Sequence, residues 1–302
     1  MSPTQWLLLV FLSVLWGGSF LFNAIAVQEL PLLTLILSRV GIGALLLVGV
    51  VYAAGHRLPR RWSGWWPFLV MALLNNTIPF LLIVRGQKEI ASGLASVLYA
   101  TTPLFAVIIG HLSSGGDRAD ARRIAGVMIG IIGVAVLVGL DAMGGAKNSV
   151  FGMLCMLAAA FLYACAGLWG RRFKDVPLPV TAACPLLCAT AILLPLALVF
   201  DQPWTLPAPS AATAWSVLGL GVLSTALGYM VFFRILAVSG AANSLLVTLL
   251  VPVSAMTLGA MILGETLLAR HLAGALIIGT ALLILDGRIL RPLLRFTSRA
   301  DQ

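Results

Sequence analysis

Polar side chains set inside long apolar stretches are the residues of this sequence that could do chemistry. A polar or charged group in a membrane-spanning helix is energetically expensive, so it normally faces the protein interior or a water-filled cavity. From there it can hold a small solute through hydrogen bonds or an ion pair. These residues form the predicted substrate-binding set, which consists of Trp16, Arg39, Asn75, Asn76, Tyr99, Tyr163, Ser224, Tyr229 and Asn243.

The charge of Arg39 has two interpretations. With a helical rise of 1.5 Å per residue, Arg39 lies about 12 Å along its predicted helix from Pro31, well inside an apolar stretch. It can act as an internal hydrogen-bonding hub, or it can attract an anionic group of a substrate. Both interpretations stay open at this point.

Asn75 and Asn76 lie just before Pro79, in a helix that we expect to be interrupted. Proline removes the hydrogen bond to the carbonyl four residues earlier, which here is that of Asn75. Polar side chains beside a freed carbonyl suit a substrate site, and hydrogen bonding between helices is the alternative interpretation. Ser224 and Gly228 hold the corresponding places in the second half of the chain.

Glycine and proline residues mark where helices are predicted to break or to move. Corresponding interrupted helices in two halves of a membrane protein point to a transport site. We expect a helix-breaking or gating role for Gly17, Gly18, Pro79, Pro103, Gly228 and Pro252. Pro103 and Pro252 are each predicted to break a helix near its centre.

The groups that most enzymes and metal sites need are absent from the apolar stretches. No Asp or Glu lies deep in a predicted helix, and the four cysteines form neither a CxxC pair nor a Cys/His cluster. No Walker A sequence is present, which excludes ATP-driven pumping by this chain. We predict no catalytic residue, no metal and no cofactor. Proton coupling would need Glu265 or a histidine, so uncoupled facilitation is the preferred interpretation.

The composition identifies the elements that must position these residues. The chain has 302 residues, of which 61% are hydrophobic and 10% charged, whereas a soluble domain carries about 25% charged residues. A helix needs roughly 20 apolar residues to cross the hydrocarbon core, where the backbone finds no water. Ten stretches meet this requirement. The predicted fold class is an all-α polytopic membrane protein with ten transmembrane helices.

The ten helices are predicted to form two copies of one unit. A constant offset of 149 residues joins pairs of rare or helix-ending residues, namely Trp66 and Trp215, Arg85 and Arg234, Pro103 and Pro252, and Gly110 and Gly259. A duplicated membrane unit is typical of transporters. We predict a first repeat over residues 1–140, a second over 148–290 and a basic tail over 291–302.

The basic residues predict the orientation of the chain in the membrane. Of the 19 Lys and Arg residues, fourteen lie in loops on one side, four on the other, and Arg39 lies within a helix. Positive charge concentrates in cytoplasmic loops, so we place both termini in the cytoplasm. Each repeat has five helices, an odd number, so the second copy must be inverted. This grouping at loop ends serves orientation, and no nucleic-acid partner is expected.

Four groups of residues recur in the order and spacing of one transporter family. They are Trp16-Gly17-Gly18-Ser19-Phe20, Ser38-Arg39, Ser92-Gly93 with Pro103 and Gly110, and Leu263-Gly264-Glu265. They resemble the drug/metabolite transporter superfamily, EamA type, with two EamA repeats. The first-repeat counterpart of the last group, Ser114-Gly115-Gly116-Asp117, lacks the glutamate in place. The resemblance implies a ten-helix fold with a central cavity between helices one, three, four, six, eight and nine.

The predicted function is that of a secondary transporter of the inner (plasma) membrane, not an enzyme. The resemblance implies export of small metabolites, commonly amino acids, by alternating access. The expected partners are a small-molecule substrate and membrane lipids. Small residues such as Gly126 and Gly130 are typical of tight helix packing and also suit a homodimer face. The alternatives are efflux of amphipathic drugs and, from other classes, a membrane-embedded enzyme or a passive pore.

Overall fold

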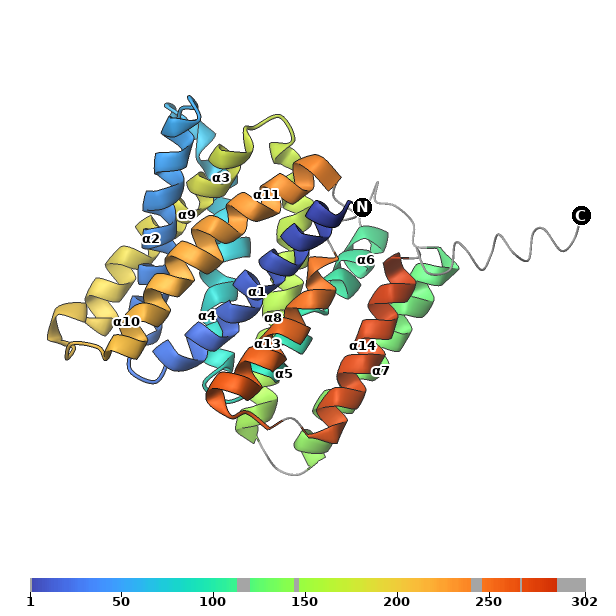
Figure 1. Cartoon of the computed structure of the whole chain (residues 1–302). Helices are drawn as coiled ribbons and strands as arrows, with labels where there is room; N and C mark the ends of the chain where they lie inside the picture. The colour runs from blue at the N-terminus through green and yellow to red at the C-terminus, as the bar shows by residue number, and fades with distance from the viewer. Residues whose placement is uncertain (1, 113–119, 144–146, 240–245, 267, 287–302) are drawn as a thin grey trace, which may run out of the picture.

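The structure is a computed structural model that describes residues 2–112, 120–143, 147–239, 246–266 and 268–286. All regular secondary structure in these ranges is helical (Figure 1). Seven helical stretches are long and apolar enough to cross a membrane, and two shorter apolar helices, Val247–Leu263 and His271–Leu285, follow. The all-helical fold is confirmed and is compatible with a polytopic membrane protein. The count of ten transmembrane helices stays a prediction.

The helices of the first half begin close to the signals that the sequence provides. Ser2 caps α1 in a reciprocal arrangement with Gln5, and Pro31 stands at the start of α2. The helical segments are α1 (Pro3–Ala26), α2 (Leu32–Ala53), η1 (Trp62–Gly64), α3 (Trp66–Ala72), η2 (Leu73–Thr77), α4 (Ile78–Gly86), α5 (Ser92–Tyr99), α6 (Thr102–Leu112) and α7 (Ala121–Met143).

The second half repeats this order of long and interrupted helices. Its segments are α8 (Lys147–Gly170), η3 (Arg171–Phe173), α9 (Leu178–Leu196), η4 (Ala197–Asp201), η5 (Pro203–Thr205), α10 (Ala211–Leu218), η6 (Gly219–Leu227), α11 (Gly228–Ser239), α13 (Val247–Leu263) and α14 (Ala269–Asp286).

Three of the spans contain π-helix, in η2, η4 and η6, and η2 and η6 lie at corresponding places of the two halves. The segment η2 ends directly before Ile78 and Pro79, and η6 ends directly before Gly228. Shifting η2 by 149 residues places it inside η6. A π-helical turn leaves carbonyls without their usual partners and is frequent at functional sites. The predicted interruptions at Pro79 and Gly228 are thus present as π-helix.

The packing of the helices follows the internal repeat. Helix α1 packs on α13 and α11, and its counterpart α8 packs on α6 and α4. Helices α2 and α9 are counterparts that pack on each other, as are α7 and α14. The pair formed by α7 and α14 stands at the edge of the bundle (Figure 1). A Cβ at Gly126 or Gly133 would meet Leu285 or Ile278, respectively, at 2.8 Å, so small residues let these two helices approach closely.

No helix break is present at Gly17, Gly18 or Pro252, and a gating role of these residues stays a prediction. Helix α1 runs without interruption through Gly17 and Gly18, and α13 runs through Pro252. Gly17 allows close approach instead, because a Cβ there would lie 2.7 Å from Cβ of Ser254 and 2.9 Å from the backbone nitrogen of Ala255 in α13. The break at Pro103 is present, since α5 ends at Tyr99 and α6 begins at Thr102.

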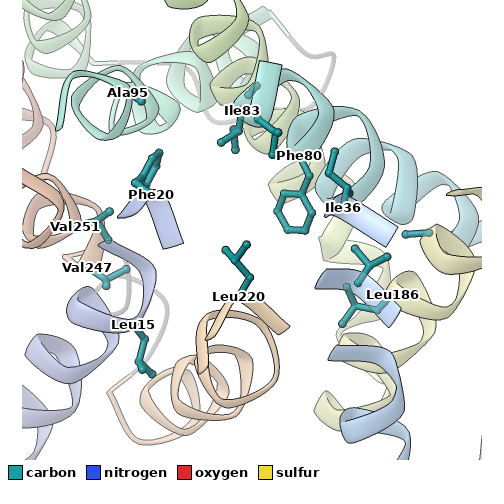
Figure 2. Packing of buried hydrophobic residues seen from close by; sticks show 14 of the residues in the cluster. Leu15, Phe20, Ile36, Phe80, Ile83, Ala95, Leu186, Leu220, Val247 and Val251 are labelled. Carbon is teal, nitrogen blue, oxygen red and sulfur yellow. The ribbon is translucent and has the colours of Figure 1, made fainter. Parts of the chain in front are cut away.

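Buried apolar side chains from both halves surround the centre of the bundle. Figure 2 shows Phe20 of α1, Phe80 of α4 and Leu220 of η6 approaching one another from three elements, and all three are buried. This apolar surround gives the polar residues beside it a low dielectric, where hydrogen bonds and charges act more strongly than in water.

Candidate substrate-binding site

A cavity of about 120 Å³ lies between the two halves of the chain. It is lined by Trp16, Ser19, Phe20, Arg39, Asn75, Phe80, Ile83, Tyr99, Tyr163, Ser224, Thr225 and Tyr229. These residues come from α1, α2, η2, α4, α5, α8, η6 and α11. All of the predicted substrate-binding set except Asn76 and Asn243 therefore meet around one space, and their role in binding stays a prediction.

The helices that line the cavity differ in two respects from those that the resemblance implied. Helix α2 contributes Arg39, whereas none of the described residues of α13, the ninth predicted helix, reaches the lining. The expectation for the ninth helix is therefore not met within the part of the chain that the structure describes. Asn243 lies outside the described residues.

Aromatic side chains make up much of the cavity wall. Three of the four tyrosines of the chain line it, and the fourth, Tyr52, is 59% exposed on α2. The rings of Tyr99 and Tyr163 meet edge to face with centroids 5.3 Å apart, and Phe20 meets Tyr99 at 5.9 Å. Such contacts hold the rings in fixed orientations, so their hydroxyl groups have defined positions.

Tyr229 is held by both asparagines of the π-helical segment η2. Nδ2 of Asn75 donates to the hydroxyl oxygen of Tyr229 at 2.9 Å, and Nδ2 of Asn76 donates to it at 3.2 Å. Asn76 is 1% exposed and does not line the cavity. Its side chain turns toward Tyr229 and orients that residue, and its predicted role in substrate binding stays a prediction.

Arg39 is a buried cation with one protein acceptor among the described residues. It is 7% exposed, and its Nε donates to Oγ1 of Thr225 at 3.2 Å. The guanidinium carbon lies 3.8 Å from the centroid of the Phe80 ring, in a cation–π contact. The remaining N–H groups of the guanidinium are left for the cavity.

The two serines of the cavity lining donate hydrogen bonds to backbone carbonyls of α1. Ser19 donates to the carbonyl of Trp16 at 2.6 Å, and Ser224 donates to the carbonyl of Leu15 at 2.8 Å. Their oxygens can still accept a hydrogen bond. Gly228 leaves space for the side chain of Trp16 in the cavity wall, because a Cβ at position 228 would lie 2.7 Å from Nε1 of Trp16.

Sequence reasoning missed several residues of the lining. The predicted set omitted Ser19, Phe20, Phe80, Ile83 and Thr225. Phe80 and Ile83 carry no contrast with the rest of an apolar helix, so no sequence signal distinguishes them. The other three had a signal, since Ser19 and Phe20 belong to a family-like motif and Thr225 follows Ser224 of the predicted set.

Three carboxylates bind the starts of helices that are distant in sequence, and the sequence did not reveal these contacts. Glu265 accepts from N and Oγ of Ser92 at 2.8 and 2.9 Å and from N of Gly93 at 3.1 Å, at the start of α5. Glu29 accepts from N and Oγ of Ser210, which caps α10, and Asp201 accepts from N and Oγ1 of Thr34 at the start of α2. Carboxylates satisfy the free N–H groups of helix starts.

No group of His, Cys, Asp and Glu that could hold a metal ion occurs among the described residues. The described part of the cavity lining likewise contains no Asp, Glu or His. The arrangement can hold a small solute by hydrogen bonds, by the charge of Arg39 and by aromatic contact.

The chain is similar to several bacterial transporters over nearly its whole length. It is 25% identical to "Uncharacterized transporter YoaV" of Bacillus subtilis, over 89% of this chain and 92% of that protein. It is 24% identical to "Probable amino-acid metabolite efflux pump" of Escherichia coli K12, covering 94% and 95%. It is 27% identical to "Uncharacterized inner membrane transporter YedA" of the same organism, covering 93% and 90%.

The fold has a counterpart among solved structures. A crystal structure of a protein matches with a TM-score of 0.66 and 20% sequence identity, covering 92% of this chain and 96% of the other. This likeness concerns the fold alone.

The sequence profile of one family matches the chain twice, over residues 4–139 and 150–285. The two matches fall on the two halves whose packing follows the 149-residue offset. Together with relatives that are transporters over their whole length, the matches establish the family. The chain belongs to the EamA-like transporter family.

Proposed function

We propose that this chain is a secondary carrier of the inner (plasma) membrane that exports amino acids or related small metabolites by alternating access. The observation that carries the proposal is the cavity itself. Polar side chains from both halves meet in it, inside the bundle, beside π-helical segments at corresponding places. Membrane carriers hold their substrate at the interface of two repeats, near interrupted helices.

The proposed architecture is ten transmembrane helices in two inverted repeats, over residues 1–140 and 148–290, with both termini and a basic tail over 291–302 in the cytoplasm. The equivalence of the α1 and α8 packing partners supports the repeats. The two halves would rock about the cavity, with Pro79, Pro103 and Gly228 at the places where the helices change direction or hydrogen-bonding pattern.

The size of the cavity favours a small solute. Pockets for drug-sized ligands measure about 300–1,000 Å³, whereas this cavity measures about 120 Å³. An apolar cavity of about 150 Å³ holds a benzene molecule. The relatives with the printed name "Probable amino-acid metabolite efflux pump" support amino-acid metabolites as the class. We therefore prefer metabolite export to efflux of amphipathic drugs.

The test compares metabolites in the medium of cells that overproduce the protein or its variants. We expect one or more amino acids or related metabolites to accumulate outside cells with the wild-type protein. The double variant Tyr99→Phe/Tyr229→Phe should lose most of this accumulation, because it removes two hydroxyls from the cavity and keeps the rings. Tyr52→Phe is the matched control, since Tyr52 is exposed outside the cavity.

Exchange in liposomes separates a carrier from a pore. Only a carrier shows faster uptake of labelled solute when the same solute is loaded on the other side. Uptake without this acceleration would favour the passive pore. If overproduction of the protein leaves the metabolites in the medium unchanged, the proposed export of amino acids and related metabolites is overturned.

A further inference from the structure

Arg39 has no anionic partner among the described residues. The ion pairs in this part of the chain are Arg85 with Glu89 and Arg122 with Asp120. The carboxylates of Glu29, Asp201 and Glu265 accept hydrogen bonds at helix starts elsewhere. A buried charge is costly unless it is paired and hydrogen-bonded. The position of Arg39 on the cavity wall makes a bound solute the natural source of the missing anion.

The contacts of the Arg39 guanidinium hold it in an orientation that suits a planar anion. Thr225 binds Nε from one side, and the Phe80 ring covers one face at 3.8 Å. These two contacts fix the plane of the group and leave its Nη edge for the cavity. Arginine binds carboxylates through two parallel N–H bonds in that plane.

The neutral groups around Arg39 also suit an anion. The hydroxyl oxygen of Tyr229 already accepts two N–H bonds, from Asn75 and Asn76, so its proton is left for a solute. The hydroxyl groups of Tyr99 and Tyr163 line the same space. Since the described lining contains no Asp or Glu, a solute ammonium group would meet only neutral acceptors and aromatic faces.

We propose that the cavity selects a monoanionic solute by its carboxylate, with Arg39 as the specificity-determining residue and with no charged partner for an amino group. The inference rests on the proposed carrier function and names the substrate class of that site. One cation in a small cavity balances one negative charge, so a dianionic phosphate ester is disfavoured. The apolar body of the solute would lie against Phe20, Phe80 and Ile83, which line the same space.

Exchange in liposomes with matched solutes tests this inference. The solutes are leucine, its 2-oxo acid and its decarboxylated amine, and the same three compounds derived from phenylalanine, each used as labelled solute and as competitor. We expect the 2-oxo acid to exchange or compete at least as well as the amino acid, and the amine to be weaker by about tenfold or more, because hydrogen bonds to a charged group are lost.

Substitutions assign the preference to Arg39. Arg39→Gln should bring acid and amine to within a few-fold of each other, whereas Arg39→Lys should keep the preference for the acid with weaker binding. Thr225→Val removes the contact that orients the guanidinium and keeps the charge, so it should weaken exchange without reversing the preference. Each variant is compared with wild type for yield and for its elution as a monodisperse species in detergent.

The outcomes are separable. An amine that exchanges as well as its acid overturns the inference and leaves the carrier function standing. The same holds if Arg39→Gln reduces exchange of acid and amine by equal factors, since that is the behaviour of a structural hub. If none of the six solutes exchanges, the proposed function fails for this class, and the inference fails with it. A preference for the acid that follows the charge at position 39 supports it.

Discussion

Glu265 shows what a single carboxylate does at the residue scale. It accepts three hydrogen bonds from Ser92 and Gly93, which are distant in sequence, and so holds the start of α5 against the end of α13. Gly259 leaves the room for this contact, because a Cβ there would lie 2.5 Å from Oε2 of Glu265. A cap of this kind contributes to stability because the first N–H groups of a helix otherwise lack partners.

We predict that Glu265→Gln lowers the free energy of unfolding by about 1–3 kcal/mol, because a neutral amide replaces a charged acceptor of three hydrogen bonds. Chemical unfolding in detergent micelles, followed by circular dichroism, measures this change. Glu89→Gln is the matched control, since the Arg85 side chain that it pairs with is 40% exposed and such ion pairs contribute about 0–1 kcal/mol. Equal losses in the two variants would contradict the cap.

Glu29 should make stability depend on pH at acidic values. Hydrogen bonds from the Ser210 hydroxyl, and then from its backbone N–H, lower the pKa of Glu29 from its usual value of 4.5. A lowered pKa in the folded state means that the stabilisation is fully present above 4.5 and is lost as the pH falls below that value. Glu29→Gln should therefore melt below wild type at neutral pH, and the difference should shrink under acid. A difference that is constant with pH would contradict this assignment.

At the scale of elements, two glycines in α1 have opposite surroundings. A Cβ at Gly17 would lie 2.9 Å from the backbone nitrogen of Ala255, which cannot move aside as a flexible side chain can. A Cβ at Gly18 would meet nothing closer than 3.8 Å. The neighbouring residues of one motif thus serve different purposes, and the contact of α1 with α13 depends on the first.

Substitution by alanine separates the two glycines. Gly17→Ala should cost about 1–3 kcal/mol of stability through overpacking, and it should reduce transport if α1 and α13 shift apart. Gly18→Ala should be neutral, or stabilising by up to about 1 kcal/mol, because alanine favours the helix more than glycine. Unfolding in detergent measures both variants. Similar values for the two would show that the close approach of α1 and α13 carries little energy.

At the scale of the whole molecule, three carboxylate contacts between the halves lie at the same end of the bundle. Glu29 meets Ser210, Asp201 meets Thr34 and Glu265 meets Ser92. The chain enters α1 at the other end, where the label N stands in Figure 1. In the proposed orientation the end with these three carboxylate contacts faces out of the cell. Rocking of the halves would have to break the three contacts to open a path there.

Labelling of single cysteines tests that orientation. In a variant without the native cysteines Cys155, Cys165, Cys184 and Cys188, Thr205→Cys should react with a membrane-impermeant maleimide on intact cells. Arg60→Cys should react only after the cells are broken, because its loop is proposed to be cytoplasmic. Both residues are exposed in the structure. The reverse pattern would overturn the orientation.

The sequence by itself determined the class of the protein and most of the cavity lining. Its apolar composition requires spanning helices, because a backbone in hydrocarbon has no other partner. The same physics sends Arg39, Asn75 and Tyr229 inward, since a polar group in lipid is costly. Proline at position 79 was enough to anticipate an interrupted helix, which the structure has as the π-helical segment η2.

The tertiary structure alone decided which of these residues meet. Asn76 turned out to orient Tyr229, Thr225 to bind Arg39, and Glu265 to cap α5. The tertiary structure also has α13 continuous through Pro252. A residue of α2 lines the cavity, whereas no described residue of α13 does. Such pairings depend on how each helix is rotated and crossed against its neighbours. The local pattern of a sequence fixes the apolar and polar positions of a helix, but contacts across more than a hundred residues fix its rotation.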